Sequence, residues 1–171
     1  HTQRRRQRQM CIRDRNRTTW FGGVDVRATK ITDAETSEIS VKKQTSTQPR
    51  LVASGSHRAE RDEKFARELG DHELVRMGSS LKACIVAEGS ADLYPRFGPT
   101  SCWDIAAAHA VVEAAGGFVL SPQCKPLVYD LVDEVLNPYF LVTCSSKWND
   151  IWAQNQDCLL YTSDAADDVE C

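Results

Sequence analysis

The sequence predicts an α/β fold in which helices and strands pack as layers. Short apolar runs of strand length alternate with helical patterns of about three turns, and this alternation is typical of layered α/β domains. The 171 residues can bury one sizeable core, so we expect a single domain. The 42% hydrophobic and 26% charged residues are the proportions of an ordinary globular protein, and no apolar stretch is long enough to span a bilayer.

Regular structure is expected from residue 50 onward. Strands are predicted where short apolar runs lie between turn signals, at residues 51–53, 73–77, 91–94, 118–120 and 140–144. Helices are predicted at residues 58–69, 78–88, 104–115 and 147–154. The first helix should end at Gly70, and Gly78-Ser79-Ser80 should open the second. The third has apolar residues at three- and four-residue spacing until Gly116 and Gly117 end the run.

The part of the chain before this pattern is more polar. Residues 18–50 are rich in Thr, Ser, Gln and Lys, and only Glu38–Lys42 alternates in the way of a strand. We therefore expect a mobile connection with one edge strand over residues 18–50. The α/β domain itself is expected to comprise residues 51–154.

The two ends differ in composition from the body of the chain. Residues 1–17 carry seven Arg and one Asp, whereas residues 158–171 carry four acidic residues and no basic one. Neither end shows amphipathic periodicity, and both resemble translated sequencing-adapter read-through. We expect residues 1–17 and 155–171 to be non-native. The alternative for the first segment is a nucleic-acid-binding arm, since clustered Arg neutralises phosphates.

The sequence also argues against several common kinds of site. Its seven cysteines are scattered without a Cys-x-x-Cys pair, which favours reduced thiols over a zinc site or a disulfide framework. It contains no Walker A, GxGxxG, HExxH or GxSxG motif. P-loop, dinucleotide-binding, zinc-protease and serine-hydrolase chemistry are therefore not expected.

The most informative carboxylate is Asp104, at the predicted start of the 104–115 helix. An Asp at that place commonly caps the helix and does nothing more. Its surroundings, YPRFGPT at residues 94–100 and then WDxAAxHA, resemble the C-terminal signature of the inositol monophosphatase superfamily. The resemblance is closest to the bacterial 3'(2'),5'-bisphosphate nucleotidases of the CysQ type and runs from about Ser54 to Cys144. It implies the C-terminal half of an inositol-monophosphatase-like fold, with Asp104 as a catalytic Mg²⁺ ligand.

Three further segments carry polar groups at strand ends or helix starts. The turn at residues 54–57 contains His57, which is a surface histidine unless it contacts a ligand. The turn before the second helix places Ser79 and Lys82 at its start, where a lysine opposes the helix dipole and a phosphate would suit it. Arg96 lies in a proline-stiffened loop and could bind phosphate in bidentate fashion or simply pair with a surface acid. The resemblance implies that all four contact the substrate.

The resemblance implies a magnesium-dependent phosphatase that removes the 3'-phosphate of 3'-phosphoadenosine 5'-phosphate to give AMP. Its partner is a small nucleotide bisphosphate rather than nucleic acid or an integral membrane, and its location is cytoplasmic or at the inner-membrane surface. The family's other metal ligands lie upstream, in a glutamate-containing segment and an Asp-Pro-x-Asp-Gly-Thr motif, and this sequence contains neither. We therefore expect the chain alone to be inactive. The alternatives are an inositol or sugar phosphate phosphatase and a non-catalytic module that binds a phosphorylated ligand.

Overall fold

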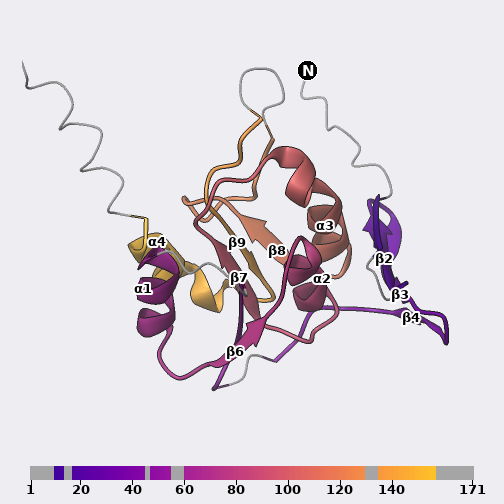
Figure 1. Ribbon diagram of the computed structural model, residues 1–171, viewed down its shortest axis with the longest axis horizontal. Coiled ribbons are helices and arrows are strands. Elements are labelled where there is room, and N and C mark those ends of the chain that lie inside the picture. The colour runs from indigo at the N-terminus through magenta and orange to yellow at the C-terminus, as the bar shows by residue number, and fades with distance from the viewer. Residues whose placement is uncertain (1–9, 14–16, 45–46, 55–59, 130–134, 157–171) are drawn as a thin grey trace, which may run out of the picture.

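The computed structural model describes residues 10–13, 17–44, 47–54, 60–129 and 135–156, which form two sheets and the helices around them (Figure 1). The first sheet is an antiparallel meander of four strands in chain order. Its strands are β1 (Met10–Arg13), β2 (Thr19–Gly23), β3 (Val26–Ile31) and β4 (Thr36–Glu38). The turn between β2 and β3 places Asp25 at φ 60°, a left-handed conformation that Asp tolerates better than most residues.

The second sheet has five strands in the order β6-β5-β7-β9-β8. They are β5 (Arg50–Ala53), β6 (Glu73–Arg76), β7 (Leu93–Arg96), β8 (Phe118–Leu120) and β9 (Phe140–Thr143). Strand β5 is parallel to β6 and β7, whereas β9 is antiparallel to β7 and β8. The carboxyl ends of β5 and β7 therefore meet the start of β9 at one edge of the sheet.

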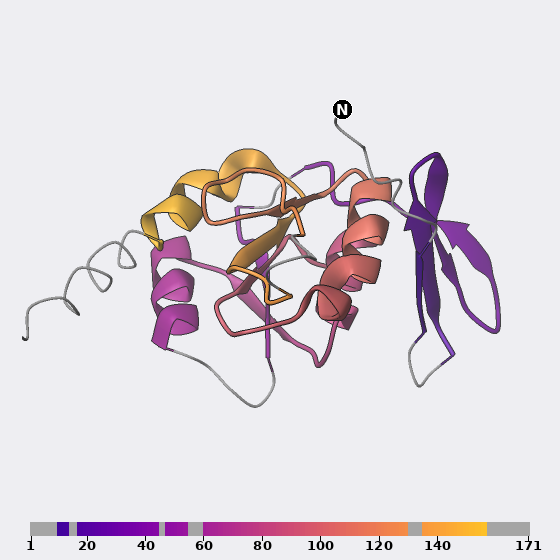
Figure 2. The same cartoon turned by 90° about the horizontal axis from the view of Figure 1, so that it is seen from above.

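The helices separate the molecule into layers. They are α1 (Glu60–Leu69), α2 (Leu81–Ala87), α3 (Cys102–Ala114) and α4 (Asn149–Gln154), the last preceded by a 3-10 turn, η1 (Ser146–Trp148). Figure 2 shows α1 and α4 on one face of the five-stranded sheet, α3 on the other, and the antiparallel sheet beyond α3. The α/β layered fold predicted from the sequence is confirmed. None of the described helices has the length and apolar character needed to cross a membrane.

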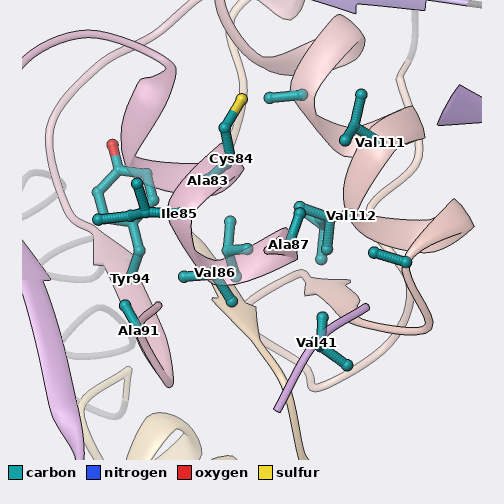
Figure 3. Packing of buried hydrophobic residues seen from close by; sticks show 14 of the residues in the cluster. Val41, Ala83, Cys84, Ile85, Val86, Ala87, Ala91, Tyr94, Val111 and Val112 are labelled. Carbon is teal, nitrogen blue, oxygen red and sulfur yellow. The ribbon is translucent and has the colours of Figure 1, made fainter. Parts of the chain in front are cut away.

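Helix α3 is covered on two sides, which explains its composition. Its buried residues are spread around the axis rather than along one stripe, as expected for a helix between two layers. A Cβ on Gly22 of β2 would lie 2.9 Å from Ala114 Cβ, so glycine and alanine allow strand and helix to approach closely. The valines of α3 pack against α2 and Val41 in the larger of two core clusters (Figure 3).

The polar segment before the α/β domain was predicted wrongly in part. Residues 19–38 form β2, β3 and β4, whereas the predicted strand at Glu38–Lys42 ends after its first residue. Strand β3 shows why, since only Ala28 of its six residues is buried and no apolar alternation results. The two ends that were expected to be non-native lie mostly outside the described residues. Within residues 1–17, strand β1 is described and pairs with β2.

The junction around Gly117 offers a test of this packing. A Cβ on Gly117 would lie 2.8 Å from Val41 Cγ1 and 2.9 Å from Val112 Cγ1. We expect Gly117→Ala to destabilise the protein by about 1–3 kcal/mol in urea denaturation. The control is Gly78→Ala, whose added Cβ meets nothing within 4 Å and should cost less than about 0.5 kcal/mol. Equal stability of the two variants would contradict the packing described for this junction.

Candidate functional site

A cavity of about 660 Å³ lies where the carboxyl ends of β5 and β7 meet the first turns of α2 and α3. Ligands of α/β proteins commonly bind at this edge of a sheet. Four of the five predicted site residues line this cavity, namely Ser79, Lys82, Arg96 and Asp104. The fifth, His57, lies outside the described residues.

Lys82 is buried, with only 5% of its surface exposed. Its Nζ lies 5.3 Å from the centre of the Tyr94 ring, a cation–π contact. Burial lowers the pKa of Lys82, and the nearby charge of Arg96 lowers it further. No ion pair of Lys82 with a carboxylate is found among the described residues. A buried cation of this kind costs stability, and an anion would be a suitable partner for it.

Arg96 ends strand β7 and reaches the same cavity. Its Nη2 donates to the carbonyl oxygen of Pro99 at 3.3 Å, while its buried Nε has no hydrogen-bond partner within the described part of the chain. Gly98 makes room for this arrangement, since a Cβ there would lie 3.2 Å from both Cζ and Nη2 of Arg96. The loop therefore holds the guanidinium in one place and leaves it donors for a ligand.

Ser79 and the start of α2 differ from the expectation. The helix begins at Leu81 rather than at the Gly-Ser-Ser turn, and it is only seven residues long. Ser79 has φ 55°, and its Oγ accepts a hydrogen bond from the Leu81 backbone N–H at 3.5 Å. Ser79 thus helps to form the turn, and the cavity places it close to where a ligand would bind.

Asp104 caps its helix and also lines the cavity. Helix α3 begins at Cys102, two residues earlier than predicted, which makes Asp104 its third residue. Asp104 Oδ2 accepts a hydrogen bond from the Ser101 backbone N–H at 2.8 Å, in a capping box. The side chain is nevertheless exposed and lines the cavity, so it remains accessible to a cation.

The described residues do not by themselves fit a magnesium site. Mg²⁺ prefers six oxygen ligands in octahedral geometry and usually takes more than one carboxylate or phosphate. Among the described residues there is no group of three or more His, Cys, Asp or Glu side chains that could hold a metal. Asp104 can supply one ligand, as the sequence indicated, and the rest would have to come from elsewhere.

Sequence reasoning assigned no role to three other residues of the cavity. Tyr94 lies beneath Lys82, and burial raises the pKa of its hydroxyl to about 12, so the ring stays neutral. Asp62 also lines the cavity, from the acidic first turn of α1. Acidic residues in a first turn commonly stabilise the helix dipole, so the sequence alone does not indicate a site there. Trp103 entered the sequence analysis only as the first residue of the WDxAAxHA motif. Its place directly before Asp104, the proposed metal-binding residue, is the signal that could have identified it.

Comparison with known proteins identifies the family. A model described as the inositol monophosphatase family matches residues 14–158. The chain belongs to the inositol monophosphatase family. Over 95 residues it is 50% identical to the 3'(2'),5'-bisphosphate nucleotidase CysQ of Escherichia coli K12, a match that covers 56% of this chain and 39% of that relative. The chain thus spans about two fifths of the length of the CysQ relatives that are 50% identical to it.

Solved structures of the inositol monophosphatase family show the same fold. CysQ from Bacteroides thetaiotaomicron superposes with a TM-score of 0.66 at 32% sequence identity, over 77% of this chain and 55% of that one. Inositol monophosphatase from Anabaena superposes with a TM-score of 0.61 at 23% identity, over 90% of this chain and 61% of that one. The likeness therefore reaches beyond the five-stranded sheet and includes regions outside the 94–115 motif.

The unpaired charge of Lys82 leads to a prediction about stability. We expect Lys82→Met to raise the free energy of unfolding by about 1 kcal/mol at pH 7, because it removes a buried charge beside Arg96. The difference in the free energy of unfolding between Lys82→Met and wild type should decrease as the pH rises toward the ordinary lysine pKa. Folded Lys82 then loses its proton before the unfolded chain does, which stabilises the wild-type fold.

Urea denaturation between pH 7 and pH 10 measures both effects. Lys125→Met is the matched control, since Lys125 is exposed and should show neither the gain nor the pH trend. A Lys82→Met protein that is less stable than wild type would contradict this prediction, because Lys82 would then stabilise the folded state.

Proposed function

We propose that this chain forms the substrate-binding part of a phosphatase that removes the 3'-phosphate of 3'-phosphoadenosine 5'-phosphate to give AMP. The observation that carries the proposal is the pairing of Lys82 and Arg96 in one cavity. Among the residues that the structure describes, Lys82 is buried without a carboxylate partner and Arg96 has an unused donor. Like charges side by side repel each other, so such a pair is best explained by a ligand that carries more than one negative charge. A nucleotide bisphosphate is a ligand of this kind.

The identity of the relatives supports a nucleotide over an inositol phosphate. The curated proteins that are 50% identical over 95 residues are named 3'(2'),5'-bisphosphate nucleotidases, whereas the inositol monophosphatase structure from Anabaena is 23% identical. An inositol or sugar phosphate remains the alternative substrate. The proposal includes a cytoplasmic location, as the resemblance implies.

Each residue of the site has a distinct part in binding. Arg96 suits bidentate contacts to a phosphate, and Lys82 adds a point charge in the same cavity. Magnesium chemistry belongs, in this proposal, to a longer protein in which Asp104 supplies one oxygen ligand. Since the described residues lack the other ligands, the chain as it stands should bind the nucleotide and leave it intact.

A second function is favoured by the same shortage of metal ligands. The chain could be a non-catalytic module that binds a phosphorylated ligand without metal, because Lys82 and Arg96 need no cation for that. The two functions differ in how magnesium affects binding through Asp104. Calorimetric titration with 3'-phosphoadenosine 5'-phosphate, in the presence of Mg²⁺ or of a chelator, distinguishes them.

Binding of the nucleotide should depend on Arg96. We expect Arg96→Ala to weaken the affinity for 3'-phosphoadenosine 5'-phosphate at least about tenfold, and Arg96→Lys to recover only part of it, because lysine cannot bind bidentately. Arg27→Ala is the control, since Arg27 is exposed on β3 and pairs with Glu38 away from the cavity. Tighter binding of inositol 1-phosphate than of the nucleotide would move the proposal to the alternative substrate.

Asp104 should respond to magnesium in a way that a helix cap would not. With chelator present, Asp104→Asn should bind the nucleotide a few times more tightly, because a negative charge beside the phosphates is gone. Added Mg²⁺ should strengthen binding by the wild-type chain and have no effect on the variant. If Mg²⁺ changes neither protein, the non-catalytic function is preferred and Asp104 is a cap only.

A further inference from the structure

Trp103 is exposed to an unusual degree for its type. Two thirds of its surface, 67%, is accessible, whereas Trp20, Trp148 and Trp152 are at most 4% exposed. Tryptophan is highly buried on average in folded proteins. Within the part of the chain that the structure describes, no hydrogen bond or ring contact involves this indole. Packing of the described residues therefore does not account for a tryptophan at this position.

The backbone that carries Trp103 is firmly held. On one side the Cys102 N–H donates to the Val135 carbonyl oxygen at 2.9 Å, and on the other the capping box joins Ser101 to Asp104 at 2.8 Å. Ile105, which follows in the same turn, is 2% exposed. An exposed ring on such an anchored turn is available to a ligand at little cost in backbone order.

The ring also lines the cavity that contains Lys82 and Arg96. Those two cations suit the phosphates of a ligand. An indole provides a large flat surface with little side-chain freedom to lose. The cavity thus combines a binding place for phosphate with a binding place for an aromatic ring.

We infer that Trp103 stacks on the base of the bound nucleotide and so makes the cavity prefer a nucleotide to a sugar or inositol phosphate. The inference rests on the proposed function, since it takes a nucleotide as the ligand. Stacking of a base on an aromatic side chain commonly changes affinity by roughly tenfold or more and tolerates any base. A sugar phosphate has no ring face of this kind and gains nothing from the indole.

The experiment compares AMP with ribose 5-phosphate, which differ only in the base. Calorimetric titration of the full chain should give tighter binding of AMP. Trp103→Ala should weaken AMP binding by roughly tenfold and leave ribose 5-phosphate unchanged, and Trp103→Phe should recover most of the loss. Phe118→Ala is the matched control, because Phe118 is also exposed but lies on β8 away from the cavity.

Tryptophan fluorescence provides a second measurement, which can be made on the wild-type chain. Trp103 is the one exposed tryptophan of the four, so it should dominate any response to a ligand in the cavity. AMP should quench the emission of the wild-type chain, and ribose 5-phosphate should not. Trp103→Phe should remove the quenching while AMP still binds.

The outcomes distinguish failure of the stacking inference from failure of the proposed phosphate-binding function. If both ligands bind equally and AMP leaves the emission unchanged, Trp103 does not stack, and the phosphate-binding function stands. An equal loss of both ligands in Trp103→Ala also overturns the stacking role, since the residue would then act through the fold. If neither ligand binds the wild-type chain while 3'-phosphoadenosine 5'-phosphate does, the inference fails and the proposed function stands. If that nucleotide does not bind either, both fail.

Discussion

The packing of α3 between the two sheets is the constraint on which the rest of the structure depends. The antiparallel sheet can approach α3 closely because Gly22 and Ala114 meet without larger side chains. On the other side Val112 is fully buried in the core that α3 shares with α2. Since both sides are filled, α3 has little freedom to rotate or slide. Its first turn is thereby directed to the cavity at the end of β7.

Helix α2 is held by a related set of contacts. Glu88, just after the helix, accepts a hydrogen bond from Trp20 Nε1 at 2.8 Å and pairs with Lys30 Nζ at 2.7 Å. These contacts join the end of α2 to the antiparallel sheet, while the opposite end of the helix carries Lys82 into the cavity. The segment that looked like a connection in the sequence is therefore part of what positions the site.

The site itself opposes the stability of the fold. Lys82 and Arg96 bring two positive charges into a half-enclosed space, and burial lowers the pKa of the lysine. The backbone around them is strained as well, since Ser79 adopts a left-handed conformation. Features that cost stability and gather in one cavity are typical of a place selected for binding. A multiply charged anion would relieve the repulsion, which is why the phosphate-binding proposal explains these features together.

The sequence by itself determined the layered α/β class, the alternation after residue 50 and the family signature around Asp104. These are local patterns, because helix periodicity and motif spacing are properties of short stretches. The sheet formed by β2, β3 and β4 was missed, since its inner face packs through residues such as Gly22 and Ala28 that leave no hydrophobic alternation. Only the tertiary structure decided that Lys82 is buried beside Arg96 and that Trp103 is exposed at the cavity. Burial and charge proximity depend on segments far apart in the chain, which no local pattern encodes.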